Sequence, residues 1–304
     1  MNNFIFENKT KVYFGKGGVK ECLGGLLANF GETVMLAYGG GSIKCNGVYD
    51  EIMGILNAAG KRIMEFSGIM SNPTYAKVQE GAKLARENHV HLILAVGGGS
   101  VSDCCKVISG AFDTLSHAME TYFGKPDENN LSDDINEAVM RSVIRNIRIL
   151  LTDPENYDAR SELAWASAMA ENGVLKIGKV TDFQAHQIEH QLGAYTNCNH
   201  GAGLAVIHPV LYRHIYKSGA ARFTRWAQNV WGIAPKGSDE ETAAAGIDAL
   251  AAFIKEIGLP TSFAELGLPA DTDFRAIADS TNVTAGYCKK LTRDEICEIL
   301  QECL

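Results

Sequence analysis

Two runs of three glycines constrain the fold of this chain more than any other feature of its sequence. Each run follows an apolar stretch of strand length, residues 33–37 in one case and 91–96 in the other, and each precedes a predicted helix. A continuous apolar stretch is typical of a buried strand in a parallel sheet. A further strand is predicted at residues 62–66, between helices at about 48–59 and 74–88. The repeated order of strand, turn and helix predicts an α/β domain with a mostly parallel sheet.

The two glycine turns, Gly39-Gly40-Gly41 and Gly97-Gly98-Gly99, also suggest a ligand. In open α/β sheets, ligands bind at the carboxyl ends of the strands. Glycines there let backbone N–H groups approach a pyrophosphate closely, and the helix that follows adds its dipole. A run of glycines can instead be no more than a flexible turn, and neither run matches the pattern G-x-G-x-x-G. Because two such turns occur in the same context, we expect a nucleotide-binding site.

The pattern changes after residue 110, where apolar residues recur at helical spacing and no strand is predicted. We therefore expect an α/β domain at residues 1–110 and an all-helical domain at residues 111–304. Two short strands are predicted near the N-terminus, at residues 4–6 and 12–14. Helices of the second domain are predicted at residues 159–172, 182–194, 203–217, 220–230, 240–257 and 293–303.

Three of the eight histidines, His186, His190 and His200, lie close together in the sequence. His186 and His190 are four residues apart, so they project from one face of a helix. Asp113 and His117 have the same spacing further upstream. One carboxylate and several imidazoles form a ligand set that suits zinc or ferrous iron.

Each of these residues also has an ordinary interpretation. A single histidine on a helix is usually a structural or surface residue, and Asp113 with His117 would make an exposed pair worth roughly a few tenths of a kcal/mol. Glu189 stands directly before His190, which is not the HExxH order of the zinc proteases. Apolar neighbours such as Leu115 and Ile188 favour a buried polar site, because buried imidazoles need partners.

The composition excludes several classes of function. The net charge is −8 and no basic block occurs, so we expect no nucleic-acid partner. No apolar run reaches the length of a membrane-spanning helix, so no membrane partner is expected, and the N-terminus lacks the pattern of a signal peptide. Eight cysteines are scattered without a CxxC pair, as in proteins with reduced thiols. We therefore expect a cytoplasmic protein.

Longer motifs occur along nearly the whole chain. They are Phe14-Gly-Lys-Gly17, Tyr38-Gly-Gly-Gly-Ser-Ile-Lys-Cys-Asn-Gly-Val-Tyr-Asp50, Ser71-Asn-Pro73, Gly97-Gly-Gly-Ser-Val-Ser-Asp103, Asp113-Thr-Leu-Ser-His-Ala-Met-Glu120, Glu162-Leu-Ala-Trp-Ala-Ser167, residues 186–203 and Lys289-Lys-Leu-Thr292. Together they make the chain resemble the iron-containing (group III) alcohol dehydrogenases, and within them the branch of butanol dehydrogenases and broad-range NADPH-dependent aldehyde reductases. The resemblance implies a dehydroquinate synthase-like architecture, in which a Rossmann-like domain precedes a helical bundle.

The resemblance also implies roles for individual residues. Four residues match the ligands of a metal ion, Fe²⁺ or Zn²⁺: Asp113, His117, His186 and His200. His190 matches the histidine beside the metal that serves in proton transfer or substrate positioning, and Asp103 matches an acid near the nicotinamide. The other matches are contacts to the dinucleotide cofactor: Asn72, Gly97, Gly98, Gly99 and Ser100.

The first glycine turn bears on the choice of cofactor. Relatives that prefer NAD tend to carry an aspartate there for the ribose hydroxyls. Here the turn, Gly39, Gly40, Gly41 and Ser42, has no carboxylate to repel a 2′-phosphate, and Lys44 is nearby. This resembles the pattern of members that prefer NADP(H), so NADP(H) is the expected cofactor and NAD(H) the alternative.

The chain departs from the family pattern at one place. Relatives have several dozen residues between the counterpart of Gly110 and the helix with the first metal ligands, including further strands of the sheet and a loop that contacts the cofactor. Here Phe112 and Asp113 follow Gly110 almost at once. The Rossmann-like domain, residues 1–110, is therefore expected to be incomplete, to bind the cofactor more weakly and to leave an unpaired sheet edge, which favours aggregation.

The leading hypothesis is a metal-dependent alcohol dehydrogenase or aldehyde reductase that works as a homodimer. It would transfer a hydride between NADP(H) and small primary alcohols or aldehydes. A second hypothesis is a catalytically impaired, metal-binding remnant of that family, unable to bind the dinucleotide productively. A third is a related enzyme on the same scaffold, a polyol dehydrogenase or a dehydroquinate synthase-like lyase, against which the motif at residues 38–50 argues.

Overall fold

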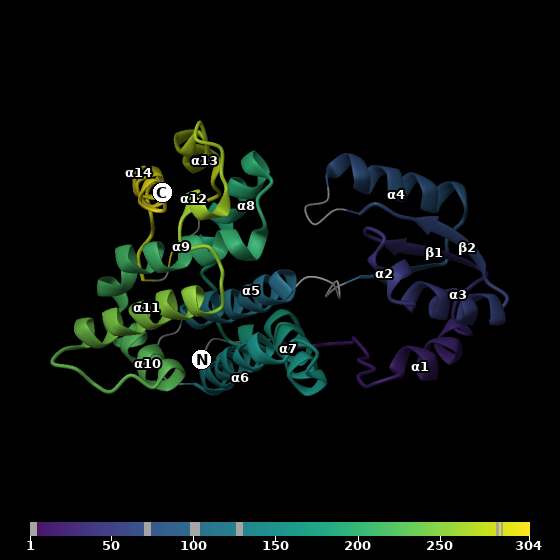
Figure 1. Ribbon diagram of the computed structural model, residues 1–304, viewed down its shortest axis with the longest axis horizontal. Helices are drawn as coiled ribbons and strands as arrows, with labels where there is room; N and C mark the ends of the chain where they lie inside the picture. The colour runs from purple at the N-terminus through teal and green to yellow at the C-terminus, as the bar shows by residue number, and fades with distance from the viewer. Residues whose placement is uncertain (1–4, 70–73, 98–103, 126–129, 284–285, 287) are drawn as a thin grey trace. The chain divides into compact units, whose positions relative to one another are not determined.

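The computed structural model of the chain describes residues 5–69, 74–97, 104–125, 130–283, 286 and 288–304 (Figure 1). The chain divides into two compact units: Lys9–Val107 forms the α/β unit, and Ile108–Leu304 forms the helical unit together with Met1–Asn8. The division falls inside helix α5 (Cys104–Tyr122), which follows the second glycine turn. The chain therefore passes between the two units twice, between Asn8 and Lys9 and within α5.

The α/β unit contains a three-stranded parallel sheet, as the sequence predicts. Its strands are β1 (Thr33–Tyr38), β2 (Arg62–Phe66) and β3 (Leu92–Val96), in the order β2-β1-β3. The central strand β1 is buried along its whole length, which explains its largely apolar sequence. The predicted fold class, an α/β part followed by a helical part, is confirmed.

Helices cover both faces of this sheet. They are α1 (Gly18–Leu27), α2 (Ser42–Cys45), α3 (Val48–Ala58) and α4 (Tyr75–Glu87). On one face Leu36 of β1 packs with Leu27 of α1 and Leu56 of α3, and all three are fully buried. On the other face Met35 of β1 packs with Leu84 of α4. Alternate residues of β1 thus enter two separate cores, as the two-residue repeat of a strand requires.

The pairing of β1 with β3 brings the two glycine turns together. Tyr38, the last residue of β1, pairs with Val96, the last residue of β3. Gly39 and Gly97 therefore leave the sheet at the same edge, at the carboxyl ends of neighbouring parallel strands. Ligands of open α/β sheets bind at this edge.

Strand β3 has an uncovered side. Among the residues that the structure describes, it pairs with β1 alone. Its Ile93 is 59% exposed, although Met35, the partner in β1, is buried. On the opposite face a cavity of about 310 Å³ lies between β3, α1 and α3, lined by apolar side chains such as Val19, Leu23 and Leu94. An uncharged strand with one edge that has no partner among the described residues favours association with other chains.

The helical unit is built from ten α-helices among its described residues, with two short 3₁₀ turns between them. In addition to α5, they are α6 (Leu131–Thr152), α7 (Tyr157–Glu171), η1 (Val174–Lys176), α8 (Gln184–Thr196), α9 (His200–Ile215), η2 (Tyr216–Gly219), α10 (Ala220–Trp231), α11 (Asp239–Glu256), α12 (Phe263–Leu266), α13 (Phe274–Ser280) and α14 (Arg293–Glu302). In the described ranges, no helix combines the length and the apolar character needed to cross a membrane.

Side-chain caps explain where many of these helices begin. Asn130, Asn156 and Ser238 each accept a hydrogen bond from a backbone N–H in the first turn of α6, α7 and α11 respectively. Thr292 forms a complete capping box with Glu295 at the start of α14. The caps of α7, α11 and α14 stand directly before the apolar periodicity in the sequence, which is why the predicted starts of these three helices lie close to the observed ones. No start was predicted for α6.

Two details of the sequence interpretation were wrong. The described residues 5–14 form no strand, because the short apolar stretches there find no neighbouring strand to pair with. The short helices α12 and α13 were not predicted, since a helix of four or seven residues shows too little periodicity to be recognised.

A buried ionic cluster fixes the C-terminal end of α5. The carbonyl oxygen of Tyr122 accepts hydrogen bonds from Lys179 at 3.0 Å and from Arg222 at 2.6 and 3.1 Å. The carboxylate of Asp133 in α6 pairs with both cations and lies 2.5 Å from Arg222. None of these three side chains is more than 3% exposed. The helix dipole favours cations at this end of α5, and the cluster joins α5 to α6 and α10.

Replacing Arg222 with Ala is expected to lower the free energy of unfolding of the helical unit by about 3 kcal/mol, because it breaks a buried ion pair. Urea unfolding followed by tryptophan fluorescence measures this, since Trp165, Trp226 and Trp231 all lie in the helical unit. The control is Arg213→Ala, which removes an exposed pair with Asp248 and should change stability by less than about 1 kcal/mol. If the two variants lose the same free energy of unfolding, the buried cluster around Arg222 does not stabilise the helical unit more than an exposed ion pair does.

Candidate metal centre

Four side chains from three helices converge in the helical unit. Asp113 and His117 lie one turn apart on α5, His186 lies on α8, and His200 is the first residue of α9. Oδ1 of Asp113 lies 3.6, 3.4 and 3.5 Å from the Nε2 atoms of His117, His186 and His200, in that order. Nε2 of His186 and Nε2 of His117 are 3.0 Å apart. The ligand atoms of Asp113, His186 and His200 thus all lie within 4.8 Å of one another. His117, the fourth residue matched to a metal ligand in the sequence, approaches Asp113 and His186.

The chain between α8 and α9 determines the position of His200. Asn197 ends α8 in the left-handed conformation, with φ of 54°. Asn199 caps α9, because its side chain accepts a hydrogen bond from the N–H of Ala202 at 3.0 Å. The short polar break therefore reverses the chain direction and starts α9 at His200.

Two glycines in the first turn of α9 allow close packing around His200. A Cβ atom on Gly201 would clash with the carbonyl oxygen of Ser109 in α5. A Cβ atom on Gly203 would lie 2.9 Å from Oε1 of Glu189 in α8. Only glycine fits at these two positions without displacing a neighbour, so the sequence His-Gly-Ala-Gly lets α9 approach both α5 and α8.

Each of the three imidazoles has a carboxylate on its outer nitrogen. Nδ1 of His117 lies 2.7 Å from Oε1 of Glu171 in α7. Nδ1 of His186 is in contact with Glu120 of α5. The His186–Glu120 contact is a hydrogen bond, whereas the His117–Glu171 contact is an ion pair without hydrogen-bond geometry. An imidazole that donates its Nδ1–H to a carboxylate keeps the lone pair of Nε2 free and the ring in a fixed orientation.

Nδ1 of His200 is likewise in contact with Glu189, a residue of α8. Sequence reasoning missed all three glutamates, Glu120, Glu171 and Glu189, as parts of the centre. Glu189 was considered only for the catalytic glutamate of the HExxH motif of zinc proteases, and it does not fit that motif because it stands directly before His190. Glu189 stands three residues after His186, a spacing that leaves it on the same side of α8, and this was the available signal.

The donor set fits a divalent metal ion. Oδ1 of Asp113 is buried and has no hydrogen-bond partner among the described residues. An ion with tetrahedral bonds of about 2.1 Å separates its ligand atoms by about 3.4 Å, close to the observed distances from this oxygen to the three nitrogens. Three imidazoles and one carboxylate suit Zn²⁺ and Fe²⁺. An ion at this point would give the orphaned oxygen its missing partner.

The carboxylates strongly favour protons on two of the imidazoles when no metal ion is bound. Burial lowers the pKa of His186, but Asp113 and Glu120 outweigh it and raise the pKa to about 9. Burial also lowers the pKa of His200, and Asp113 and Glu189 raise it to about 10. Burial favours a high pKa for Asp113, yet His186 and His200 hold it well below its usual range.

Binding of Zn²⁺ at pH 7 is therefore expected to release about one to two protons per ion, since the metal replaces protons on Nε2 of His186 and His200. The affinity for Zn²⁺ should rise with pH up to the pKa of about 10 at His200, and less steeply above the pKa of about 9 at His186, because fewer protons then compete. Calorimetry in two buffers of different ionisation enthalpy measures the release. Binding without proton release would contradict the charge distribution described here.

His190 lies beside the four converging residues. Its ring stacks on that of His200, with centroids 5.4 Å apart and an interplanar angle of 22°. Loss of water around the ring lowers the pKa of His190, and the positive charges of His200 and His186 lower it further. His190 is therefore neutral near pH 7 and able to accept a proton, which suits the role in proton transfer that the sequence resemblance implies.

The predicted cofactor residues belong to the α/β unit. Gly39, Gly40 and Gly41 follow β1, Gly97 follows β3, and Ser42 and Lys44 lie in α2. The remaining predicted contacts lie outside the described residues: Asn72, Gly98, Gly99, Ser100 and Asp103.

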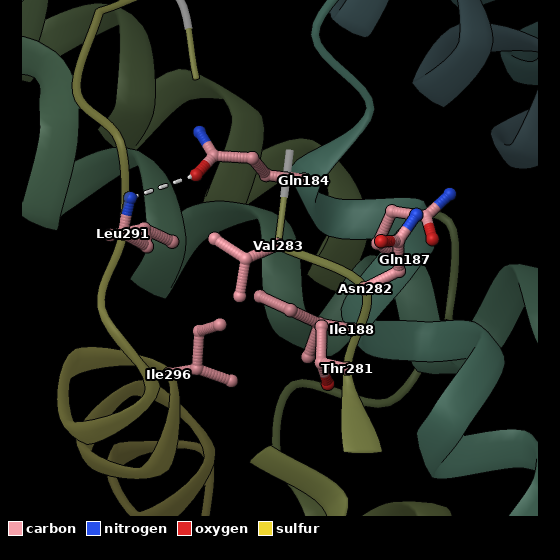
Figure 2. Close-up of a pocket in the computed structure, with 8 residues that line it drawn as sticks. All are labelled: Gln184, Gln187, Ile188, Thr281, Asn282, Val283, Leu291 and Ile296. Atoms are coloured by element: carbon pink, nitrogen blue, oxygen red, sulfur yellow. Dashed lines mark hydrogen bonds between the residues drawn. The ribbon is translucent and has the colours of Figure 1, made fainter. Parts of the chain in front are cut away.

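A small cavity lies beside α8, next to Gln184 (Figure 2). Ile188 of α8 and Ile296 of α14 face one another across it. Its volume of about 10 Å³ leaves room for about one water molecule, so it is too small to hold a substrate. Gln184 accepts a hydrogen bond from the N–H of Leu291 at 3.2 Å (Figure 2). This bond ties the segment before α14 to the helix that carries two of the histidines.

Replacing Glu189 with Gln is expected to weaken Zn²⁺ binding by about ten- to a hundredfold, because a neutral amide orients and polarises His200 less strongly. Competition with a fluorescent chelator measures the affinity. Glu162→Gln is the control, because Glu162 is exposed on α7 and should leave the affinity unchanged. If both variants bind Zn²⁺ as tightly as the native protein, Glu189 does not support the centre.

A small parallel sheet with two glycine turns, followed by a helical unit with an imidazole–carboxylate centre, defines a two-domain protein of dehydroquinate synthase-like architecture. The family model described as "Fe-containing alcohol dehydrogenase family, C-terminal" matches residues 107–304, and the model "Iron-containing alcohol dehydrogenase" matches residues 9–138. The chain belongs to the iron-containing alcohol dehydrogenase family, as its sequence motifs indicate.

Several characterised or solved proteins are similar to this chain. Probable NADH-dependent butanol dehydrogenase 1 of Bacillus subtilis is 30% identical, and the match covers 100% of both chains. NADPH-dependent aldehyde reductase YqhD of Escherichia coli is 27% identical over 88% of this chain and 90% of that protein. The crystal structure of NADH-dependent butanol dehydrogenase A from Thermotoga maritima has a TM-score of 0.92 at 27% identity, with 100% of this chain and 99% of that chain covered.

The alignment with one of these relatives shows how many positions are missing from this chain. The alignment with the Bacillus subtilis protein extends over 389 positions, whereas this chain has 304 residues. At least 85 positions of the alignment, the difference between these two numbers, therefore have no counterpart here. This agrees with the several dozen residues that the sequence motifs indicate to be absent.

Proposed function

We propose that the chain is a metal-dependent alcohol dehydrogenase or aldehyde reductase that transfers a hydride between NADP(H) and small primary alcohols or aldehydes. The observation that carries the proposal is the convergence of three Nε2 atoms on the buried, unpaired Oδ1 of Asp113. An ion pair that only stabilises the fold requires one carboxylate and one cation. Here three imidazoles face one carboxylate, and each contacts a further carboxylate on its outer nitrogen. Such a set does suit a metal that activates an oxygen-containing substrate.

Individual residues then have distinct parts in the reaction. Asp113 and the three histidines hold Fe²⁺ or Zn²⁺, which supplies Lewis-acid polarisation of the substrate oxygen. His190 takes the hydroxyl proton when an alcohol is oxidised, for which its lowered pKa keeps the ring neutral, and returns the proton when an aldehyde is reduced. The N–H groups of the glycine turns beginning at Gly39 and Gly97 bind the phosphates of the dinucleotide.

The cofactor and the assembly are part of the same proposal. Lys44, with no carboxylate in the turn at residues 39–42, supports NADP(H), and NAD(H) is the alternative. The names of similar proteins include both, since the Bacillus subtilis relative is called NADH-dependent and the Escherichia coli relative NADPH-dependent. A cytoplasmic location agrees with the scattered, free cysteines such as Cys22 and Cys45, and the homodimer is what the family resemblance implies.

One observation favours a second candidate function. At least 85 aligned positions are absent, and β3 has an exposed Ile93 and, in the described ranges, only one neighbouring strand. A protein with this sheet could keep the metal centre, which lies wholly in the helical unit, and still fail to bind a dinucleotide. The second candidate is therefore a metal-binding remnant without dehydrogenase activity.

A two-stage assay distinguishes the two candidates. The purified protein is loaded with Fe²⁺ or Zn²⁺, its metal content is measured, and NADPH binding is followed by fluorescence. Butanal is then added and the loss of NADPH absorbance is recorded. We expect one metal ion per chain, saturable NADPH binding and NADPH oxidation that depends on butanal. Stoichiometric metal without NADPH binding would overturn the dehydrogenase proposal and support the remnant.

A further inference from the structure

A cluster of four side chains stands beside the first glycine turn: Tyr38, Lys44, Tyr49 and Glu65. They come from different elements of the α/β unit. Tyr38 ends β1, Glu65 lies near the end of β2, and the other two are in α2 and α3. The cluster therefore lies at the carboxyl ends of two neighbouring parallel strands, the edge at which ligands of such sheets bind.

The tyrosines hold a carboxylate and an ammonium group in place. The carboxylate of Glu65 accepts hydrogen bonds from the hydroxyls of Tyr38 at 2.5 Å and Tyr49 at 2.8 Å. Nζ of Lys44 lies 3.8 Å from Oε2 of Glu65 and 4.6 Å from the centre of the Tyr49 ring. The side chains of Lys44 and Glu65 are 49% and 41% exposed, so both charges remain open to a ligand.

This arrangement changes the argument about the cofactor. The glycine turn has no carboxylate of its own, but Glu65 brings one to Lys44 from the neighbouring strand. In dinucleotide-binding sheets an acidic residue about 20 residues beyond the glycine turn accepts hydrogen bonds from the adenosine ribose, and a basic residue accommodates a 2′-phosphate. This cluster contains both kinds of residue.

We propose that Lys44 and Glu65 together recognise the 2′ position of the adenosine ribose, and that Glu65 limits the preference for NADP(H). The proposal rests on the proposed function, because it places a dinucleotide at the first glycine turn. Lys44 attracts a 2′-phosphate and Glu65 repels it, whereas a 2′-hydroxyl donates a hydrogen bond to Glu65. Because the two charges cancel, the native site binds both cofactors with affinities that differ by less than about tenfold.

The test measures the adenosine half of the cofactor alone. Adenosine 2′,5′-bisphosphate and 5′-AMP are titrated into the full chain by calorimetry, and the ratio of their dissociation constants is compared among variants. Glu65→Gln keeps the size of the side chain and removes the negative charge, so it should shift the ratio about five- to tenfold in favour of the bisphosphate. Lys44→Met should shift the ratio in the opposite direction.

A matched control is present in the same unit. Lys83 and Glu87 of α4 form an exposed pair whose charged atoms are also 3.8 Å apart. Glu87→Gln makes the same change of charge away from the glycine turn, so it should leave the ratio unchanged. Circular dichroism shows whether each variant folds, and Lys44→Met decides the question if Glu65→Gln does not fold.

Two results would overturn the proposal. One is a ratio of dissociation constants that stays within about twofold of the native value in both Glu65→Gln and Lys44→Met. Removing one charge at 4 Å in water should change a dissociation constant about fivefold. The other is an absence of binding for both probes. These outcomes are distinct from failure of the proposed function, because neither probe needs the metal, the nicotinamide or the aldehyde. If the native chain binds both probes but does not oxidise NADPH, the proposal for Lys44 and Glu65 remains valid and the proposed dehydrogenase activity is contradicted.

Discussion

The carboxylate of Asp113 is the constraint on which the rest of the helical unit depends. Its buried Oδ1 faces three Nε2 atoms without a hydrogen bond, so its negative charge must be balanced by protonated imidazoles or by a metal ion. The fold supports this arrangement from outside. Glutamates hold the three imidazoles by their outer nitrogens, and glycines in α9 remove the side chains that would keep His200 away. The cluster at Tyr122 fixes the far end of α5, which carries Asp113.

The two units carry different parts of the chemistry, and the missing positions affect them unequally. Every candidate metal ligand and its supporting glutamate lies in the helical unit, between α5 and α9. The glycine turns and the cluster around Glu65 lie in the α/β unit, where the described sheet has only three strands. Helix α5 begins in one unit and ends in the other, so the stretch that follows the second glycine turn and Asp113 lie on the same helix.

Much of this could be predicted from residue patterns, and what could not has physical causes. The parallel sheet followed from apolar runs that end in glycine, and the four converging residues followed from motif resemblance. The pairing of the glutamates with the histidines could not be recognised, because Glu120 contacts His186 and Glu189 contacts His200, partners on other helices. Only the position of Glu189 on the same side of α8 as His186 left a signal in the sequence. For the same reason the carboxylate beside Lys44 was missed, since Glu65 approaches from the adjacent strand and not from the turn. Tertiary pairing, which no local spacing contains, decided each case.

X-ray absorption spectroscopy of the Zn²⁺-loaded chain tests the central claim most directly, because it reports the atoms bound to the ion. The account predicts three imidazole nitrogens and at least one oxygen at about 2.0–2.2 Å, with no sulfur. In the variant His200→Ala one imidazole should be lost from that shell. A shell with a sulfur ligand at about 2.3 Å, or with fewer than three imidazoles in the native chain, would contradict the assignment of Asp113, His117, His186 and His200 as the metal centre.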